Sequence, residues 1–197
     1  MGSRPWNHNI HYHDEVLRSV PPGCGRALDV GCGEGLLTRR LAACCGHVTG
    51  IDVDSGVLAR ARGATAPELG IDFIEGDLLT HPFPDDSFDF ITAVAALHHL
   101  PLRAALARFR RLLRPGGVLT VIGLFRVQSV EDYIRSAIAF PASWILRCLR
   151  THAEVTAPVQ DPRETLAEIR TACDAILPGA VLQRRLLFRY SLIWRKP

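Results

Sequence analysis

Three glycines at alternate positions, Gly31, Gly33 and Gly35, follow the apolar run of residues 26–30 and precede a helical pattern that begins at Leu36. A strand, a glycine turn and a helix in this order form a nucleotide-binding arrangement. Glycine suits the turn because a side chain would hold a ligand away from the backbone, and because a tight turn often requires a positive φ. The stretch is therefore a candidate nucleotide site.

The spacing of these glycines distinguishes between nucleotides. The dinucleotide pattern Gly-x-Gly-x-x-Gly would place its third glycine at the position of Leu36, which disfavours a nicotinamide oxidoreductase. The stretch instead has the form Asp-x-Gly-x-Gly-x-Gly and resembles the first motif of the class I S-adenosylmethionine (SAM)-dependent methyltransferases. The resemblance implies SAM as the cofactor and implies these cofactor-binding residues in the turn: Asp29, Gly31, Cys32 and Gly33.

An acidic residue ends the next apolar run. Asp52 lies 21 residues after Gly31, the distance at which a strand, helix and parallel strand deliver a carboxylate to the hydroxyls of a ribose. In the resembled family this acid binds the ribose, and the next residue, here Val53, lies against the adenine. The alternative is that the segment only begins a helix, with Asp54 or Ser55 as the N-cap and Asp52 incidental.

Further motifs of the same enzymes follow in the same order. Residues 71–78 alternate as a third strand and end in Gly-Asp, so the resemblance implies that Asp77 accepts the adenine amine and that the backbone amide of Leu78 meets a ring nitrogen. The phrase Phe-Pro-Asp-x-Ser-Phe-Asp in residues 83–89 and the phrase Arg-Pro-Gly-Gly in residues 114–117 are also typical of the family.

Residues 92–100 take the place that faces the transferred methyl group in the resembled family, and Ala93 is expected to contact the cofactor. The Asn/Asp-Pro-Pro-Tyr/Phe tetrapeptide of nucleobase amino methylation is absent from them. His98 is the first candidate for a general base or a cofactor contact, while His99 could hydrogen-bond inside the protein. Neighbouring residues in a short turn are expected to point apart; a structural role for both histidines is the alternative.

Aromatic and imidazole groups are dense in residues 1–20, which the resemblance implies form a lid over the methionine end of the cofactor. Tyr12 is the expected cofactor contact in this segment, and His11 is the second candidate base; the alternative is that the Tyr12 ring only packs on the sheet. His8, His11 and His13 lie close together, but no carboxylate or thiol completes a set, so no metal is expected.

Length and composition predict one domain over residues 1–197. The net charge of +3 is too small to argue for nucleic acid or a membrane surface. Six cysteines without a C-x-x-C pair, and no leader segment at the start, favour the cytoplasm. No apolar run reaches the roughly 20 residues of a membrane span. The oligomeric state is left open.

The apolar periodicity predicts an α/β fold. Residues 101–113 have helical spacing, with four arginines expected on a solvated face and Pro115-Gly116-Gly117 expected to end the helix. A second amphipathic helix is predicted over residues 165–177, and two strands over residues 181–187 and 189–195. The resemblance implies a Rossmann-like seven-stranded sheet in the order 3-2-1-4-5-7-6, with strand 7 antiparallel and helices on both faces.

Residues 125–160 match no general core motif and stand where the resembled family has its substrate lid. Their aromatic side chains are expected to form apolar walls; these are Phe125, Tyr133, Phe140 and Trp144. The predicted function is in-line methyl transfer from SAM to a small, partly apolar metabolite. The alternative is a catalytically silent SAM-binding partner or scaffold subunit.

Overall fold

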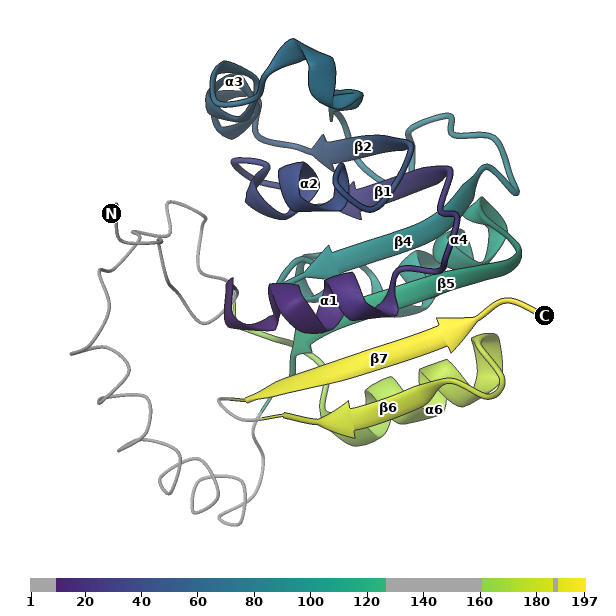
Figure 1. Cartoon of the computed structure of the whole chain (residues 1–197). Helices are drawn as coiled ribbons and strands as arrows, with labels where there is room; N and C mark the ends of the chain where they lie inside the picture. The colour runs from purple at the N-terminus through teal and green to yellow at the C-terminus, as the bar shows by residue number, and fades with distance from the viewer. Residues whose placement is uncertain (1–9, 127–160, 186–187) are drawn as a thin grey trace.

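A computed structural model describes residues 10–126, 161–185 and 188–197, and its centre is a seven-stranded sheet (Figure 1). The strands, in chain order, are β1 (Arg26–Val30), β2 (His47–Asp52), β3 (Ile71–Glu75), β4 (Phe88–Val94), β5 (Leu113–Leu124), β6 (Val181–Arg184) and β7 (Arg189–Arg195). They lie in the order β3-β2-β1-β4-β5-β7-β6. The predicted sheet order is therefore confirmed.

The strands β1 to β5 are all parallel to one another, whereas β7 is antiparallel to both of its neighbours, β5 and β6, as predicted. The carboxyl ends of the parallel strands therefore share one edge of the sheet, and the antiparallel β7 begins at that edge (Figure 1). The strand order reverses between β1 and β4, and ligands of open α/β sheets bind at such a switch point, outside the carboxyl ends.

Helices cover both faces of the sheet. The described helices are η1 (Ile10–Tyr12), α1 (His13–Ser19), α2 (Leu36–Leu41), α3 (Ser55–Gly63), η2 (Pro67–Leu69), η3 (Leu97–His99), α4 (Leu102–Leu112) and α6 (Leu166–Ile176). Residues of α4 and α6 join the larger apolar cluster, which holds Phe109 and Trp194. Residues of α1 and α2 join the second cluster, which holds Val16 and Leu41. Successive residues of β5 alternate between the two clusters, as the pleat of a strand requires.

Side-chain caps fix where two of the helices begin. The carboxylate of Asp54 accepts the N–H groups of Gly56 at 2.8 Å and Val57 at 3.1 Å, so Asp54 is the N-cap of α3. Thr165 and Glu168 form a capping box at the start of α6. The helix predicted over residues 165–177 is thus present as Leu166–Ile176. Because Asp54 caps α3, Asp52 is left for another role.

Two predicted boundaries differ from the structure. The helix α4 ends at Leu112, and Leu113 already pairs with Phe88 in the sheet, so the Pro-Gly-Gly segment expected to end the helix lies within β5. The carbonyl of Leu112 accepts the Ser87 N–H at 2.9 Å, which draws the chain into the sheet before it reaches the proline. Among the described residues β6 ends at Arg184, earlier than predicted.

Candidate functional site

The glycine turn lies at the carboxyl end of β1 and is fastened to the end of β2. The N–H of Gly31 donates to the Ile51 carbonyl at 2.8 Å. A Cβ added to Gly31 would lie 2.5 Å from the Cβ of Ala96, so this glycine is required by the protein itself. A Cβ added to Gly33 would meet no atom within 4 Å. Of these two glycines, only Gly33 therefore faces space that a ligand can enter.

Asp52 lies at the end of β2, against this turn. One carboxylate oxygen accepts the Gly33 N–H at 2.9 Å, and the other accepts the Asp54 N–H at 3.1 Å. Each oxygen keeps a lone pair for a further donor, such as a ribose hydroxyl. Beside it, the side chain of Val53 is 71% exposed and offers an apolar surface against which a flat ring can lie.

Asp29 lies beneath the turn, in the interior. Its side chain accepts a hydrogen bond from the Thr38 hydroxyl at 2.7 Å. Burial raises the pKa of Asp29 to about 7; the Thr38 hydrogen bond opposes this shift and the nearby charge of Asp52 adds to it. Thr38 was not singled out in the sequence. Its position between the buried Leu37 and the next inward residue, Leu41, is the signal that could have found it.

Asp77 follows β3, one residue after Gly76, whose N–H donates to the Asp52 carbonyl at 2.9 Å. The Asp77 carboxylate accepts the Leu79 N–H at 2.8 Å, which fixes the side chain over its own turn. The structure thus brings Asp52 and Asp77, predicted to hold the two ends of the adenosine, to neighbouring positions.

Arg108 is a correction to the sequence analysis, which assigned it to a solvated face of α4. Its side chain is only 12% exposed. The guanidinium donates to the carbonyls of His81 at 2.7 Å and Phe83 at 3.2 Å, so it holds the loop after Asp77. Arg108 is three residues after the buried Ala105, and helical spacing could have placed it on the inner side.

Besides Asp29 and Tyr12, three further predicted cofactor-binding residues have buried side chains: Cys32, Leu78 and Ala93. The Cys32 sulfur packs over Gly50, where an added Cβ would lie 2.9 Å from it. Burial also raises the pKa of the Cys32 thiol. These residues can therefore meet a ligand only through their backbone groups, as the interpretation of Leu78 already required.

His98 lies in η3, after β4. It is half-buried, and its Nδ1 has no hydrogen-bond partner among the described residues. Burial, His99 and the charge of Arg189 lower the pKa of His98 to about 4. The expectation that the two histidines point apart is wrong, because their ring centroids are 4.0 Å apart with planes 40° from parallel. The half-buried ring of His98 and the exposed ring of His99 therefore form a tilted contact.

The N-terminal candidates differ in burial. Tyr12 is buried in the second apolar cluster with Val16, so its ring does pack on the sheet. Burial raises the pKa of its phenol. His11 is exposed, and its ring meets Tyr12 edge-on at 5.1 Å. His13 is buried, its Nδ1 has no hydrogen-bond partner in the described part of the chain, and burial lowers its pKa to about 4.

Arg189, the first residue of β7, is a functional candidate that the sequence analysis missed. It lies opposite Leu124 of β5, at the edge where the parallel strands end, and is only 9% exposed. Its charge adds to the lowering of the His98 pKa and opposes the rise that burial causes in the Tyr12 pKa, so the three side chains share one neighbourhood. Its position in the strand is the signal that could have found it. Tyr190 and Leu192 are buried on one face of β7, so Arg189 belongs to the opposite face, and it is buried there as well.

The rest of the predicted site falls partly outside the described residues. Residues 1–9 and 127–160, with His8, Tyr133, Phe140 and Trp144, lie there. Phe125 is described: it is 2% exposed within the main core, and the Arg184 guanidinium lies 5.2 Å from its ring centroid. Phe125 therefore packs the core and forms no wall of an open site.

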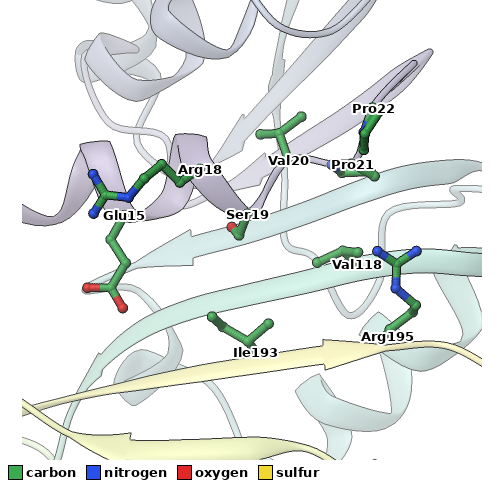
Figure 2. A pocket seen from close by; sticks show the side chains of 9 residues that line it. All are labelled: Glu15, Arg18, Ser19, Val20, Pro21, Pro22, Val118, Ile193 and Arg195. Atoms are coloured by element: carbon green, nitrogen blue, oxygen red, sulfur yellow. The ribbon is translucent and has the colours of Figure 1, made fainter.

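A groove of about 510 Å³ lies elsewhere, between α1 and the strands β5 and β7 (Figure 2). Val118 near the start of β5 and Arg195 at the end of β7 line it, together with the Pro21-Pro22 segment. These residues mark the amino edge of the parallel strands, opposite the glycine turn. The groove is thus too distant from the turn to hold a group that reacts there.

Within the described residues, no group of three or more histidine, cysteine or acidic side chains could hold a metal ion. No helix in those residues is long and apolar enough to cross a membrane.

Comparison with known proteins places this geometry in context. Residues 28–121 match the family model described as a methyltransferase domain. The chain is 39% identical to an uncharacterized methyltransferase of Mycobacterium tuberculosis over 198 residues, 98% of each protein. It is also 39% identical to a sterol 24-C-methyltransferase of Gibberella zeae over 121 residues, which are 57% of this chain and 31% of that protein. A solved SAM-dependent methyltransferase from Methanosarcina mazei superposes with a TM-score of 0.64 at 21% identity, covering 98% of this chain and 99% of that one.

Proposed function

Because this chain belongs to the class I SAM-dependent methyltransferases, we propose that it transfers the methyl group of SAM to a small, partly apolar metabolite by in-line displacement. SAM, when bound, supplies an electrophilic methyl group on a sulfonium. The protein residues have to hold it, align an acceptor with it and exclude water. The whole chain, residues 1–197, acts as one domain in this proposal.

One observation carries the assignment of the cofactor residues: the Gly33 N–H donates to Asp52 beside open space. The exposed Val53 then lies against the adenine and Asp52 accepts the ribose hydroxyls. Asp77 accepts the adenine amine, and the Leu78 amide donates to a ring nitrogen. The backbones of Gly31, Cys32 and Ala93 shape the floor of the site. Asp29, buried beneath the turn, favours the cationic end of the cofactor in its ionised form, which a nearby positive charge stabilises.

The acceptor is placed beyond the sulfonium, where Tyr12 and His98 share one neighbourhood with Arg189. A small apolar acceptor is supported by the name of the relative from Gibberella zeae, which methylates a sterol. The N-terminal segment, residues 1–20, and the segment 125–160 complete the proposal as lids, although most of the latter lies outside the described residues. A cytoplasmic location is proposed from the cysteine content.

The role of His98 follows from its charge state. A pKa of about 4 keeps the imidazole neutral at pH 7, but it also makes the ring a weak proton acceptor, since a general base works best with a pKa near the working pH. We therefore assign His98 to orienting the acceptor through a hydrogen bond rather than to removing a proton from it. His11, exposed beside Tyr12, is the remaining candidate base.

The experiment that tests the proposal is turnover with methyl-labelled SAM and a library of small apolar alcohols, phenols, acids and amines. Transfer of label to at least one organic-extractable product, with release of S-adenosylhomocysteine, is the expected result. SAM binding by calorimetry without any transfer would favour the alternative, a catalytically silent partner subunit. Efficient labelling of tRNA, DNA or protein would overturn the small-molecule assignment.

A further inference from the structure

We infer that Arg189 binds an anionic oxygen of the methyl acceptor, so that the substrates are apolar molecules carrying an acidic oxygen group, such as a carboxylate or an acidic phenol or enol. This inference rests on the proposed function, because it names the chemistry of the acceptor at that same site. It gives Arg189 the role of a specificity-determining residue.

The position of Arg189 is the first part of the argument. It begins β7 at the carboxyl edge of the sheet, and it shares the strand face of Ser191, whose hydroxyl accepts a hydrogen bond from Arg185 at 3.0 Å. This is the face of the sheet that α1 covers, because Ile193 on the same side of β7 packs against the second apolar cluster. Arg189 therefore lies at the carboxyl edge on the side of the sheet that α1 covers, next to β5. The ion pair of Glu15 with Arg185 brings α1 close to this end of β7.

The burial of Arg189 is the second part. A guanidinium keeps its charge at all ordinary pH values, although burial lowers the pKa of this one. Burying a charge is costly unless oppositely charged or acceptor groups meet it. A guanidinium has five N–H donors in a planar fork, more than one neighbour can engage. It can therefore bind a ligand oxygen in addition to its contacts within the protein.

The neighbours of Arg189 favour an anion over other acceptors. Tyr12 and His98 are both neutral at pH 7, since burial raises the pKa of the phenol and lowers that of the imidazole to about 4. Among these three side chains, Arg189 therefore carries the charge. A protonated amine would meet repulsion from Arg189 and from the sulfonium, whereas an acidic hydroxyl would lose its proton more readily. An acceptor that enters as an anion needs no general base.

The transfer step then balances without a proton. A lone pair of the acceptor oxygen forms the new O–C bond to the methyl carbon while the S–C bond breaks and its electron pair stays on sulfur. The anion and the sulfonium become a neutral methyl ester or ether and neutral S-adenosylhomocysteine. Because the negative charge on oxygen falls during the step, Arg189 binds the substrate at least as strongly as the transition state. Its contribution is therefore expected in KM and not in kcat.

The test uses matched probes with the full chain saturated with SAM. Octanoate is paired with octanamide, and 4-nitrophenol with 4-nitrobenzyl alcohol. Binding is measured by ligand-observed NMR on the S-adenosylhomocysteine complex, and transfer by methyl-labelled SAM. For Arg189→Gln we expect the Kd and KM of the acidic probes to rise about 10- to 100-fold, as for a lost charged hydrogen bond, with little change in kcat or in the neutral probes.

Two further variants control for indirect effects. Arg195→Gln removes an exposed arginine from the same face of β7 at the opposite edge, and it should leave all probes unaffected. Arg189→Lys keeps the positive charge and should restore part of the affinity for acids. SAM affinity unchanged from that of the original protein shows that each variant is folded. Should Arg189→Gln fail this check, the Lys variant and the acid-over-amide preference of the original chain decide the question.

The outcomes separate the inference from the proposed function. Equal losses for acidic and neutral probes, or no preference for acids at all, would overturn the role of Arg189. Methylation of neutral alcohols independent of Arg189 would support the methyl transfer and contradict the inference. Arg189-dependent binding of acids without transfer to any library compound would support the anion site and contradict the proposed function.

Discussion

Two regions of the carboxyl edge divide the site. The cofactor region comprises the turn 31–35, Asp52, Val53 and Asp77, and the acceptor region comprises Tyr12, His98 and Arg189. In the cofactor region the polar groups are acids fixed by backbone N–H groups, as Asp52 is by Gly33 at 2.9 Å. In the acceptor region the polar groups are a buried cation, a buried phenol and a half-buried neutral imidazole.

This difference explains why the cofactor region could be predicted from the sequence and the acceptor region could not. The contact between Gly33 and Asp52 joins residues only 19 apart, within one strand–helix–strand unit. The ion pair of Glu15 and Arg185, which ties α1 to the end segments, joins residues 170 apart. Local motifs recur with fixed spacing because backbone geometry sets them. A long-range cluster depends on which strand the last segment joins.

The largest effect is expected from the turn of the cofactor region. Gly31→Ala would place a Cβ 2.5 Å from Ala96 at a φ of +67°, so we expect the free energy of unfolding to fall by about 2 to 5 kcal/mol through left-handed strain and overpacking. Urea denaturation measures this loss. A loss of this size would show that the cofactor region is rigid before any ligand arrives, unlike a region that is ordered only by its ligand.

Two other glycines are the controls for Gly31. Gly23 has a φ of +71° and Gly33 a φ of +52°, and an added Cβ meets no atom within 4 Å at either position. Each alanine variant should cost about 1 to 2 kcal/mol of stability from the backbone alone. Only Gly33→Ala should also weaken SAM binding, as measured by calorimetry. Equal stability losses at all three glycines would remove the distinction between Gly31 and Gly33.

The second prediction is that Asp29, beneath the turn of the cofactor region, and His13, next to Tyr12 of the acceptor region, make stability depend on pH in opposite directions. Asp29 has its pKa raised to about 7, so the unfolded chain binds fewer protons there, and the stability from this group is full below about pH 4 and lost as the pH rises to 7. His13, beside the acceptor region, has its pKa lowered to about 4, so its contribution is full above about pH 6.5 and lost as the pH falls.

Single variants separate the contributions of Asp29 and His13 to the pH dependence of the free energy of unfolding. Asp29→Asn should make the free energy of unfolding fall more steeply between pH 7 and pH 4, and His13→Asn should do the reverse, each on the order of 2 to 4 kcal/mol over that interval. His98 adds a smaller slope of the same sign as His13, because it is more exposed. Chemical denaturation at a series of pH values is the measurement. If the free energy of unfolding depended on pH in the same way for the original chain and both variants, the prediction would be contradicted.

The helices and the positions of the cofactor acids could be predicted because apolar periodicity and motif spacing are local properties, whereas the strand order was implied by the resemblance to the family. The end of α4 could not, since the contact of Leu112 with Ser87 decides it. Arg108 was misassigned because an arginine in a helix is most often solvated, whereas here three distant carbonyls accept its hydrogen bonds. Arg189 carries no motif at all; only the pairing of β7 with β5 brings it to the site.

A third prediction concerns the ribose contact. Asp52→Ala removes the acceptors for two hydroxyls and for the Gly33 N–H, so SAM affinity should fall by about 1.5 to 3 kcal/mol. Calorimetry measures it. Asp72→Ala, which removes an exposed acid paired with His47, is the matched control and should leave the affinity unchanged. Unaltered affinity for Asp52→Ala, or competition between NADH and SAM, would count against the cofactor region as defined.

The smallest effect is expected where the two regions meet, at Tyr12. Tyr12 is already buried, so deleting the segment 1–14 would remove part of the second apolar cluster along with any lid. Tyr12→Phe is the more specific variant, because it keeps the ring and removes only the hydroxyl. If the phenol touches the cofactor, SAM affinity should fall by about 0.5 to 1.5 kcal/mol, as for one neutral hydrogen bond. Tyr190→Phe, on the other face, is the control.

Hydrogen exchange gives a second measurement of the same contact. Amides of η1 and of the first turn of α1 should exchange more slowly once SAM is added, because a ligand held by Tyr12 stabilises the local fold. The amides around Trp194, on the far side of the sheet, should not change. Exchange at residues 10–13 that is indifferent to SAM, together with full affinity in Tyr12→Phe, would assign this ring to packing and leave the cofactor region to bind SAM alone.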